Sequence, residues 1–425
     1  MRRVAITGIG LVTAFGVGTP VTWARLLQGD SAIGPISAFD ASSLGTRIGA
    51  EIRSFSAAEY VSRPRILKFM TRADQFAFVA ATLAIREAGW QLDRLPGDRA
   101  GVFTGGNKEM CDPEHLSEAL VAARSPEGVA DMFRFGEAAR TKINPLFYVQ
   151  GVPGSSLFFI SEAFGMMGAN AYFAGTAESG LAAIGAAFRA IRRGEADVAV
   201  AGGFDEPITW WNLSKLDAIG ILSDRNDLGA AACRPFDRAR SGSVLGDGAA
   251  FLALEELEVA RRRSATIYAE VTGYGAAFDN RGLLSPDPSG SEVTRAVHAS
   301  LRDAGVAVDA VDYVVAHGSA TRLGDVAEAR GLRTALGATA DRVAASAIKA
   351  GTGHLVAGAG ALNAAVAALA TLHGEVPPTL NLESPDPECR LNLTPLAARR
   401  LPIHNSIAIA RGIEGQAAVL ALRKV

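Results

Sequence analysis

Cysteine is scarce in this sequence, and the few cysteines lie far apart. The 425 residues include 3 cysteines, Cys111, Cys233 and Cys389, and none of them belongs to a CxxC pair. A disulfide framework or a structural zinc site needs clustered cysteines, often with histidines at fixed spacing. The sequence therefore excludes a disulfide-stabilised scaffold, predicts no bound metal, and favours a reducing compartment such as the cytoplasm.

The sequence also lacks an excess of charge of either sign. Lysine and arginine number 42 against 44 aspartates and glutamates, which gives a formal net charge of −2. Nucleic-acid-binding proteins usually carry basic clusters, and no such cluster occurs here. Hydrophobic residues make up 49% of the chain and glycine contributes 46 residues. This composition predicts a large, tightly packed core and no nucleic-acid partner.

No apolar run is long enough to suggest a membrane anchor. The N-terminal apolar segment is interrupted by Thr7 and by glycines, which is typical of a buried strand rather than of a signal peptide. The Ala-rich stretch 358–372 is apolar but shorter than the ~20 residues that span a bilayer. We expect a core helix there and no association with a membrane.

Apolar runs typical of buried strands alternate with helical patterns along the whole chain. We expect strands at 4–9, 100–104, 171–175, 197–203, 267–273, 311–317 and 417–422, and helices at 74–87, 180–193, 291–304, 326–336 and 358–372. This alternation predicts an α/β protein with two similar halves, 1–255 and 256–425. The less regular segment 105–150 is predicted to cap a pocket or to contact a partner subunit.

Gly8-Ile9-Gly10 follows a strand pattern and matches the start of a dinucleotide-binding fingerprint. The third glycine of that fingerprint falls at Thr13, and no suitably spaced acidic residue follows a second strand. We interpret the two glycines as a tight turn after the strand.

Four separated segments, in this order, resemble the elongating class of β-ketoacyl-acyl carrier protein synthases. They read VAITGIGLVTAFG, GTAESGLAAIGAAFRAIRRGEADVAVAGG, CRPFDRARSGSVLGDGAAFLALEELEVARRR, and AHGSATRLGD followed by IKAGTGHLVAGAGALNA. The resemblance spans essentially the whole chain. It implies the five-layered αβαβα fold of the thiolase superfamily, built from two similar halves, and a dimeric protein. It also implies acyl substrates carried on the phosphopantetheine of an acyl carrier protein, with no cofactor bound to the chain itself.

The resemblance places Glu178 where the family has its nucleophilic cysteine, because the family turn T-A-C-S-G here reads TAESG. A helix N-terminus lowers the pKa of a cysteine in such a turn, and the same dipole is expected to keep Glu178 ionised. A carboxylate is a poor acyl acceptor from a thioester, since the mixed anhydride that would form lies uphill. The chain alone is therefore not expected to perform ordinary cysteine-dependent condensation.

Two histidines match the family's catalytic pair. His317 and His354 are expected to donate hydrogen bonds, as neutral imidazoles, to the thioester oxygen of a malonyl unit while carbon dioxide leaves. Lys349 and Glu328 match the residues that support this pair. These matches imply that part of the catalytic geometry has been retained.

Further matches concern substrate binding and a C-terminal loop. Ser319 and Thr321 match the hydroxyls that hold the pantetheine arm, where the family usually has threonine first. Ile413 replaces the phenylalanine that gates the nucleophile, and is expected to keep the backbone amide of the oxyanion hole. Glu414 replaces a glycine, and Arg411 is expected to pair with Glu414 or with the carboxylate that replaces the cysteine.

Three functions are compatible with these residues. The chain resembles most closely a chain length factor, the ketosynthase β-subunit that forms a heterodimer with an active ketosynthase and shapes its acyl tunnel. Alternatively, Glu178 with His317 and His354 acts on acyl- or malonyl-carrier protein without a cysteine, as a decarboxylase or by general-base acyl transfer, and a homodimer then suffices. The third hypothesis is a non-catalytic protein that binds acyl carriers.

Overall fold

A mixed β-sheet forms the framework of the chain. The computed structural model describes residues 1–91, 96–107 and 113–425. Within this part of the chain, one sheet of 12 strands has the order β13-β11-β10-β15-β16-β9-β1-β8-β7-β5-β6, with β2 paired to β1. Its strands are β1 (Val4–Thr13), β2 (Gly16–Val17), β5 (Ala100–Gly106), β6 (Asn170–Ala174), β7 (Val198–Asp205), β8 (Gly248–Glu256), β9 (Ala269–Phe278), β10 (Tyr313–Val315), β11 (Ala344–Ser346), β13 (Asn392–Leu393), β15 (Asn405–Arg411) and β16 (Gln416–Arg423).

Strand β1 joins two groups of strands. It pairs antiparallel with β8 from Val4 to Thr13, but with β9 only from Val4 to Ile6. The first group consists of β1, β8, β7, β5 and β6, and the second of β9, β16, β15, β10, β11 and β13. The two groups therefore touch at one end of β1 and leave room between them for helices.

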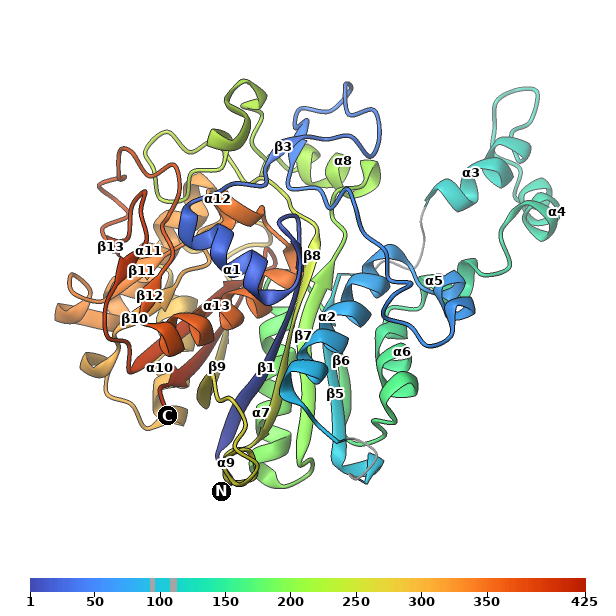
Figure 1. Cartoon of the computed structure of the whole chain (residues 1–425). Helices are drawn as coiled ribbons and strands as arrows, with labels where there is room; N and C mark the ends of the chain where they lie inside the picture. The colour runs from blue at the N-terminus through green and yellow to red at the C-terminus, as the bar shows by residue number, and fades with distance from the viewer. Residues whose placement is uncertain (92–95, 108–112) are drawn as a thin grey trace.

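Helices fill this space and cover the outer faces of both groups (Figure 1). Helix α7 (Ser179–Arg193) contacts β5 and β7 and also β16, while α13 (Ala359–His373) contacts β15 and β8. Helix α2 (Arg72–Ala88) covers β1 and β8, and α10 (Ser291–Ala304), packed on α11 (Arg322–Leu336), covers β9 and β16. The predicted five-layered αβαβα thiolase-like fold is confirmed.

Both faces of the first strand group are apolar. Val198 and Val200 of β7 pack with α2, whereas Ala199 and Ala201 pack with α7 and α13. Successive side chains of a strand point to opposite faces, so an uninterrupted apolar run makes a strand that is buried on both sides. This is why the strands could be recognised as continuous apolar runs.

Gly8 and Gly10 lie inside β1, so the expected turn at this position was wrong. A Cβ at Gly8 would lie 2.1 Å from the carbonyl oxygen of Ala84, and one at Gly10 would lie 1.8 Å from that of Ala80. Both alanines belong to α2. The glycines let the helix backbone rest directly on the strand, which explains the partial dinucleotide-binding pattern by packing.

Every strand and helix expected from the periodicity is present, with its ends displaced by a few residues. Within the main sheet the periodicity missed β2, β8, β11, β13 and β15, and it also missed several helices. These include α1 (Thr19–Gln28), α6 (Ser155–Phe164), α8 (Trp210–Ala218), α9 (Leu257–Arg262) and α12 (Lys349–Thr352).

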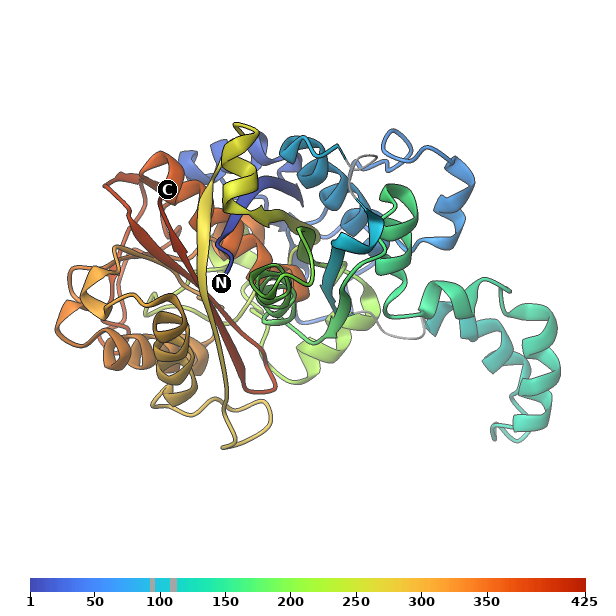
Figure 2. The same ribbon diagram turned by 90° about the horizontal axis from the view of Figure 1, so that it is seen from below.

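Part of the excursion expected at 105–150 forms a helical arm. Figures 1 and 2 show its first two helices standing away from the sheet. Val121 and Phe133 on the arm are each 75% exposed. Its role in capping a pocket or contacting a subunit stays a prediction, and residues 108–112, with Cys111, lie outside the described part of the chain. The arm consists of α3 (Pro113–Ala122), α4 (Met132–Lys142) and α5 (Phe147–Gly151).

The change from the first strand group to the second falls near the predicted boundary between 1–255 and 256–425. Strand β8 ends at Glu256 and β9 begins at Ala269. Both β1 and α13 contact strands of the two groups. A division into two domains at this boundary stays a prediction.

Helix α13 and the turn before it form the one long apolar helical stretch among the described residues. By length and composition alone, Val356–His373 could cross a membrane. However, 89% of this stretch is buried inside the fold, between the two strand groups. The prediction of a core helix is confirmed.

Candidate functional site

A cavity of about 540 Å³ lies where the N-terminus of α7 meets the loops after β10 and β15. Thr176 and Ala177 line this central cavity from the α7 side, and Ile413 lines it from the loop between β15 and β16. His317 and His354 line it from the second half of the chain. Much of the remaining wall is apolar and includes Leu216, Ile219, Leu222, Leu245, Leu284 and Val356.

His317 is held from its backbone and from its ring. Glu328 Oε1 accepts a hydrogen bond from the backbone N–H of His317 at 2.6 Å, and Lys349 Nζ donates to the His317 carbonyl oxygen. Lys349 Nζ and the backbone N–H of Arg411 both approach Nδ1 at 3.4 Å. With donors on Nδ1, a neutral His317 carries its proton on Nε2.

His354 has the same tautomer for a similar reason. Its Nδ1 accepts a hydrogen bond from the backbone N–H of Val356 at 2.9 Å, which leaves the proton on Nε2. The two rings lie 5.2 Å apart, centre to centre, at 77°. Burial and the nearby charge of Lys349 hold the pKa of both His317 and His354 well below the ordinary value. The pair thus offers neutral N–H donors to the central cavity.

Glu328 and Lys349 support the histidine pair from two sides. Glu328 is fully buried, and its Oε2 accepts a second hydrogen bond from the backbone N–H of Gly318 at 2.8 Å. Burial lowers the pKa of Lys349 to about 8, although Glu328 opposes this fall. These contacts fix the loop in which His317 lies.

Two hydroxyls line the central cavity beside His317. Ser319 Oγ and Thr321 Oγ1 lie 2.8 Å apart, in the loop that leads into α11. Their role in binding the pantetheine arm stays a prediction. Ala320 between them adopts a positive φ of 62°, which is uncommon for a residue other than glycine.

The carboxyl of Glu178 is folded against the backbone next to the central cavity. A Cβ at Gly175 would lie 2.3 Å from Oε1 and a Cβ at Gly412 would lie 2.3 Å from Oε2. Thr176 Oγ1 lies 3.2 Å from Glu178 Oε2 and 2.9 Å from Glu414 Oε2. Among the described residues that form the nearby wall, Ala177 and Gly412 face the cavity in place of Glu178.

The amide expected in the oxyanion hole is engaged in the same group of contacts. The backbone N–H of Ile413 donates to Thr176 Oγ1 at 3.1 Å. We call Thr176, Glu178, Ile413 and Glu414 the carboxyl cluster. Within it, one threonine hydroxyl joins two carboxyls to a backbone amide that was expected to be open to a substrate.

Burial opposes the expected effect of the helix N-terminus on Glu178, and the expected pairing of Arg411 was wrong. Burial raises the pKa of Glu178 to about 7, and Glu414 adds to the rise, so the helix N-terminus does not dominate. Arg411 does not pair with either of these glutamates. Its Nη2 lies 2.6 Å from Oε1 of the fully buried Glu292, and its Nη1 donates to the carbonyl oxygen of Gly324 at 2.9 Å.

The whole chain matches known condensing-enzyme sequences. Residues 1–260 match Beta-ketoacyl synthase, N-terminal domain, and residues 268–383 match Beta-ketoacyl synthase, C-terminal domain. The chain belongs to the β-ketoacyl synthase family. A 3-oxoacyl-[acyl-carrier-protein] synthase 2 from Coxiella burnetii is 36% identical to this chain, over 100% of the chain and 99% of the relative.

Solved ketosynthase structures have the same fold over the full length. A type II PKS ketosynthase in complex with its acyl-carrier protein matches with a TM-score of 0.87 and 26% identity, covering 100% of this chain and 99% of the other. The ishigamide ketosynthase/chain length factor matches with a TM-score of 0.87 and 29% identity, with the same coverage.

The geometry separates two chemical capacities of this β-ketoacyl synthase homologue. His317 and His354 remain aimed at the central cavity, where their N–H groups could stabilise negative charge on a thioester oxygen. In the carboxyl cluster, Thr176 Oγ1 contacts both carboxyls and accepts a hydrogen bond from the Ile413 amide. Stabilisation of an enolate is therefore compatible with the site, whereas acceptance of an acyl chain at position 178 is not supported.

Sequence reasoning missed residues that hold the loop of Ser319 and Thr321. Asp325 and Arg240 are buried and contact this loop from α11 and from the segment after β7. Both residues lie inside segments that carry the family resemblance. Charged residues in those segments were the signal by which sequence reasoning could have found them. Among the described residues, no group of three or more His, Cys, Asp or Glu side chains is arranged to hold a metal ion.

Proposed function

We propose that this chain is a ketosynthase-like subunit of a type II polyketide or fatty acid synthase that does not itself carry the acyl chain. In this proposal Glu178 occupies the position of the nucleophilic cysteine. The carboxyl cluster is the observation that supports it most directly, because Thr176 Oγ1 contacts the Glu178 carboxyl and accepts a hydrogen bond from the Ile413 amide. A carboxylate has neither the nucleophilicity of a thiolate nor a stable acyl product.

The proposed role is that of a chain length factor, which pairs with an active ketosynthase and shapes its acyl tunnel. Among the described residues β6 ends the sheet, with β5 as its neighbour, and its middle residues are partly exposed. Large apolar side chains are exposed around this edge, including Tyr148 (71%), Phe158 (62%) and Met167 (72%). An exposed edge strand flanked by apolar side chains is suited to pairing with another chain.

The proposed partner is a ketosynthase of the same fold, and the proposed substrate is an acyl group on the phosphopantetheine of an acyl carrier protein. Two similar solved proteins, a ketosynthase/chain length factor and a ketosynthase complexed with its carrier protein, support both assignments. The arm, with Phe133 exposed, is the second surface available for this partner. A cytoplasmic location and the absence of a bound cofactor belong to the same proposal.

A second function is favoured by the histidine pair. Neutral His317 and His354, both protonated on Nε2, suit decarboxylation of a malonyl group on the carrier protein. This activity would need no cysteine and no heterodimer. Glu178 would contribute as a neutral carboxyl, because an anion beside a developing enolate raises the barrier.

One experiment separates the two functions. The purified chain is incubated with malonyl-acyl carrier protein, with and without a cysteine-containing ketosynthase encoded beside it, and the acyl groups are identified by mass spectrometry. The chain length factor role predicts elongated products only in the mixture, unaffected by Glu178→Ala. The decarboxylase role predicts acetyl-carrier protein from the chain alone, lost in His354→Ala.

Phe133→Asp tests the proposed partner surface. Phe133 is on the arm, far from the histidine pair in the sequence, and is 75% exposed. This variant should reduce co-purification with the ketosynthase, whereas Glu137→Gln on the same helix should not. A clean homodimer that decarboxylates malonyl-carrier protein would refute the chain length factor role.

A further inference from the structure

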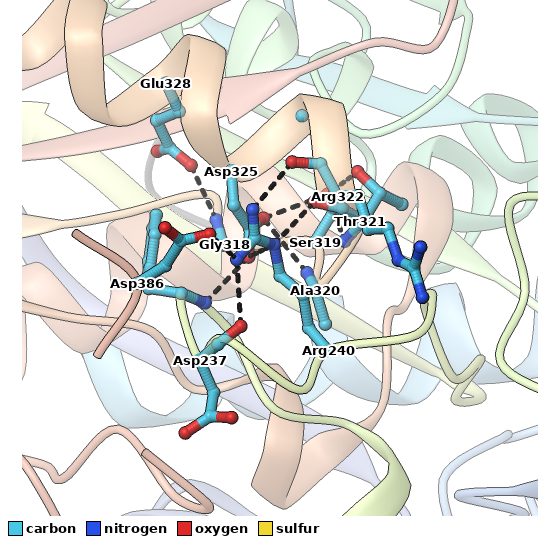
Figure 3. Close-up of polar contacts among 12 residues, drawn as sticks. Asp237, Arg240, Gly318, Ser319, Ala320, Thr321, Arg322, Asp325, Glu328 and Asp386 are labelled. Atoms are coloured by element: carbon cyan, nitrogen blue, oxygen red, sulfur yellow. Dashed lines mark hydrogen bonds and ion pairs between the residues drawn. The ribbon is translucent and has the colours of Figure 1, made fainter. Parts of the chain in front are cut away.

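Arg240 is a buried arginine that is not among the site residues implied by the family resemblance. Its side chain is 3% exposed, and its guanidinium crosslinks three segments (Figure 3). Nε donates to the carbonyl oxygen of Thr321 at 3.2 Å, and Nη2 donates to that of Arg322 at 2.7 Å. Nη1 donates to the carbonyl oxygen of Asp237 at 2.8 Å and to Asp386 Oδ2 at 2.6 Å. A planar fork of this kind fixes backbone positions in a way that lysine cannot.

Asp325 lies between Arg240 and the two hydroxyls of the central cavity. It is fully buried, and its Oδ2 lies 3.7 Å from Arg240 Nε while accepting the backbone N–H of Phe236 at 2.7 Å. Its Oδ1 accepts the backbone N–H of Ala320 at 3.1 Å and the hydroxyl of Ser319 at 3.3 Å. Figure 3 shows these contacts converging on the loop before α11.

This arrangement sets the direction of the hydroxyl hydrogen bonds. Ser319 Oγ donates to Asp325 Oδ1 at 3.3 Å, and the ionised form of Asp325, which Arg240 favours, only accepts. Ser319 Oγ then accepts from Thr321 across the 2.8 Å contact. Since the proton of Thr321 is used in this way, its oxygen keeps lone pairs free for a ligand. Thr321 lines the central cavity, so these lone pairs are available there.

The charge of Asp325 depends on its neighbours. Burial raises the pKa of Asp325 to about 7, and Arg240 opposes the rise. Without Arg240, the neutral form of Asp325 would gain population and could donate its own proton to Ser319. The Ser319–Thr321 pair would then lose its fixed direction.

We propose that Arg240 is a positioning residue that, through Asp325 and two backbone carbonyls, makes Thr321 a hydrogen-bond acceptor for an amide N–H of the ligand arm. The ligand class is a thioester carrier with secondary amides, such as phosphopantetheine. The inference rests on the proposed function in one respect, namely that the central cavity receives this arm. It goes further by assigning the polarity of the contact and the residue that sets it.

The test compares two probes with the full chain. One is pantetheine, and the other is a pantetheine analogue with an ester oxygen in place of the amide nitrogen nearest the thiol. A net hydrogen bond of ordinary strength predicts that the wild-type chain binds the amide about five- to tenfold more tightly. Arg240→Met should bring this ratio close to one by weakening amide binding alone, and Thr321→Val should do the same. Arg240→Lys keeps the charge and should retain an intermediate ratio.

Arg234→Met is the matched control. Arg234 belongs to the same segment, donates to the carbonyl oxygen of Ala231 at 2.9 Å and lies 3.6 Å from Asp237, but it has no contact recorded with Thr321. It should keep the amide preference. An unchanged ratio in Arg240→Met, or an equal loss in both arginine variants, would overturn the positioning role.

Two results with the wild-type chain distinguish the inference from the proposed function. Equal binding of both probes would refute the acceptor role of Thr321 while leaving arm binding intact. Binding of neither probe would refute arm binding by the central cavity, and with it the inference.

Discussion

Replacing Glu178 by glutamine should change how the stability of the protein depends on pH. Burial raises the pKa of this carboxyl from 4.5 to about 7 in the folded protein. A group whose folded pKa lies above its unfolded pKa makes no unfavourable contribution below the unfolded value. Above the unfolded pKa, the carboxyl loses its proton more readily in the unfolded chain than in the buried site, so ionisation favours unfolding. This loss of stability grows until the pH passes the folded pKa. The shift corresponds to about 3 kcal/mol of lost stability above pH 7.

Glutamine has nearly the same shape and no titrating proton, so Glu178→Gln removes this cost. The free energy of unfolding is measured by urea titration between pH 4.5 and 8, at one protein concentration, for both proteins. The variant should gain relative to the wild type as pH rises, by up to about 3 kcal/mol at pH 8. Taking the difference at each pH cancels other buried groups that titrate in both proteins, such as Asp325.

Glu137→Gln is the control. Glu137 is exposed on α4, so this substitution removes one charge without changing the carboxyl cluster. Its difference from the wild type should stay within about 0.5 kcal/mol at every pH. A constant difference between Glu178→Gln and the wild type across this range would refute the buried, pH-sensitive carboxyl. A gain toward low pH would refute the sign of the argument.

Three further predictions follow from the same contacts. Gly412→Ala should destabilise the wild type, because its Cβ would lie 2.3 Å from Glu178 Oε2, and it should cost less in a Glu178→Ala background. Urea titration of the double-mutant cycle should give a coupling free energy of about 1–3 kcal/mol, and additive effects would contradict the placement of the carboxyl. Glu178→Cys should gain an acyl adduct from acyl-carrier protein, detected by intact mass, whereas Glu178→Gln should not; a folded cysteine variant without adduct would show that the acyl site is lost beyond this residue. Arg411→Met leaves the buried Glu292 without its ion-pair partner and should cost about 3–5 kcal/mol, measured by urea titration, with Arg400→Met on the surface as the near-neutral control.

The layers of the fold were readable from the sequence because buried strands produce long apolar runs. Strand β7 and helix α7 follow each other with clear changes of period, so both were predicted. Strand β15 follows an irregular segment and was missed. The glycines of β1 were misread as a turn, since close packing on α2 and a turn both call for glycine, and the sequence alone does not distinguish them.

The membership of the site was more predictable than its contacts. Motif positions placed His317 and His354 at one cavity, and the structure brings them together. The partners of charged residues were not predictable, because they depend on loops from distant elements. Arg411 pairs with Glu292 at the start of α10. The sequence around Arg411 does not indicate this partner, because α10 is a distant part of the chain.

The protonation of Glu178 illustrates the same limit. A helix N-terminus favours an anion by typically 0.3–1 kcal/mol, and that effect can be read from the sequence. Burial acts in the opposite direction and prevails, with the pKa raised to about 7. Its size depends on how Gly175 and Gly412 enclose the carboxyl. The neighbouring Glu414 raises the pKa of Glu178 further. Glu414 comes from the loop before β16, which is remote from Glu178 in the chain.

The histidine pair and the carboxyl cluster have mostly separate supports, and the backbone N–H of Arg411, beside the loop of the cluster, also approaches His317 Nδ1. His317 is held by Glu328 and Lys349, both from the second half of the chain, and His354 by its own backbone turn. The carboxyl cluster is held by Thr176 at α7 and by the loop before β16. Among the described residues, no hydrogen bond or ion pair is recorded between Glu178 and either histidine. A substitution at the helix N-terminus therefore leaves most contacts of the two histidines in place, so the presence of both histidines is not by itself evidence that the chain performs condensation.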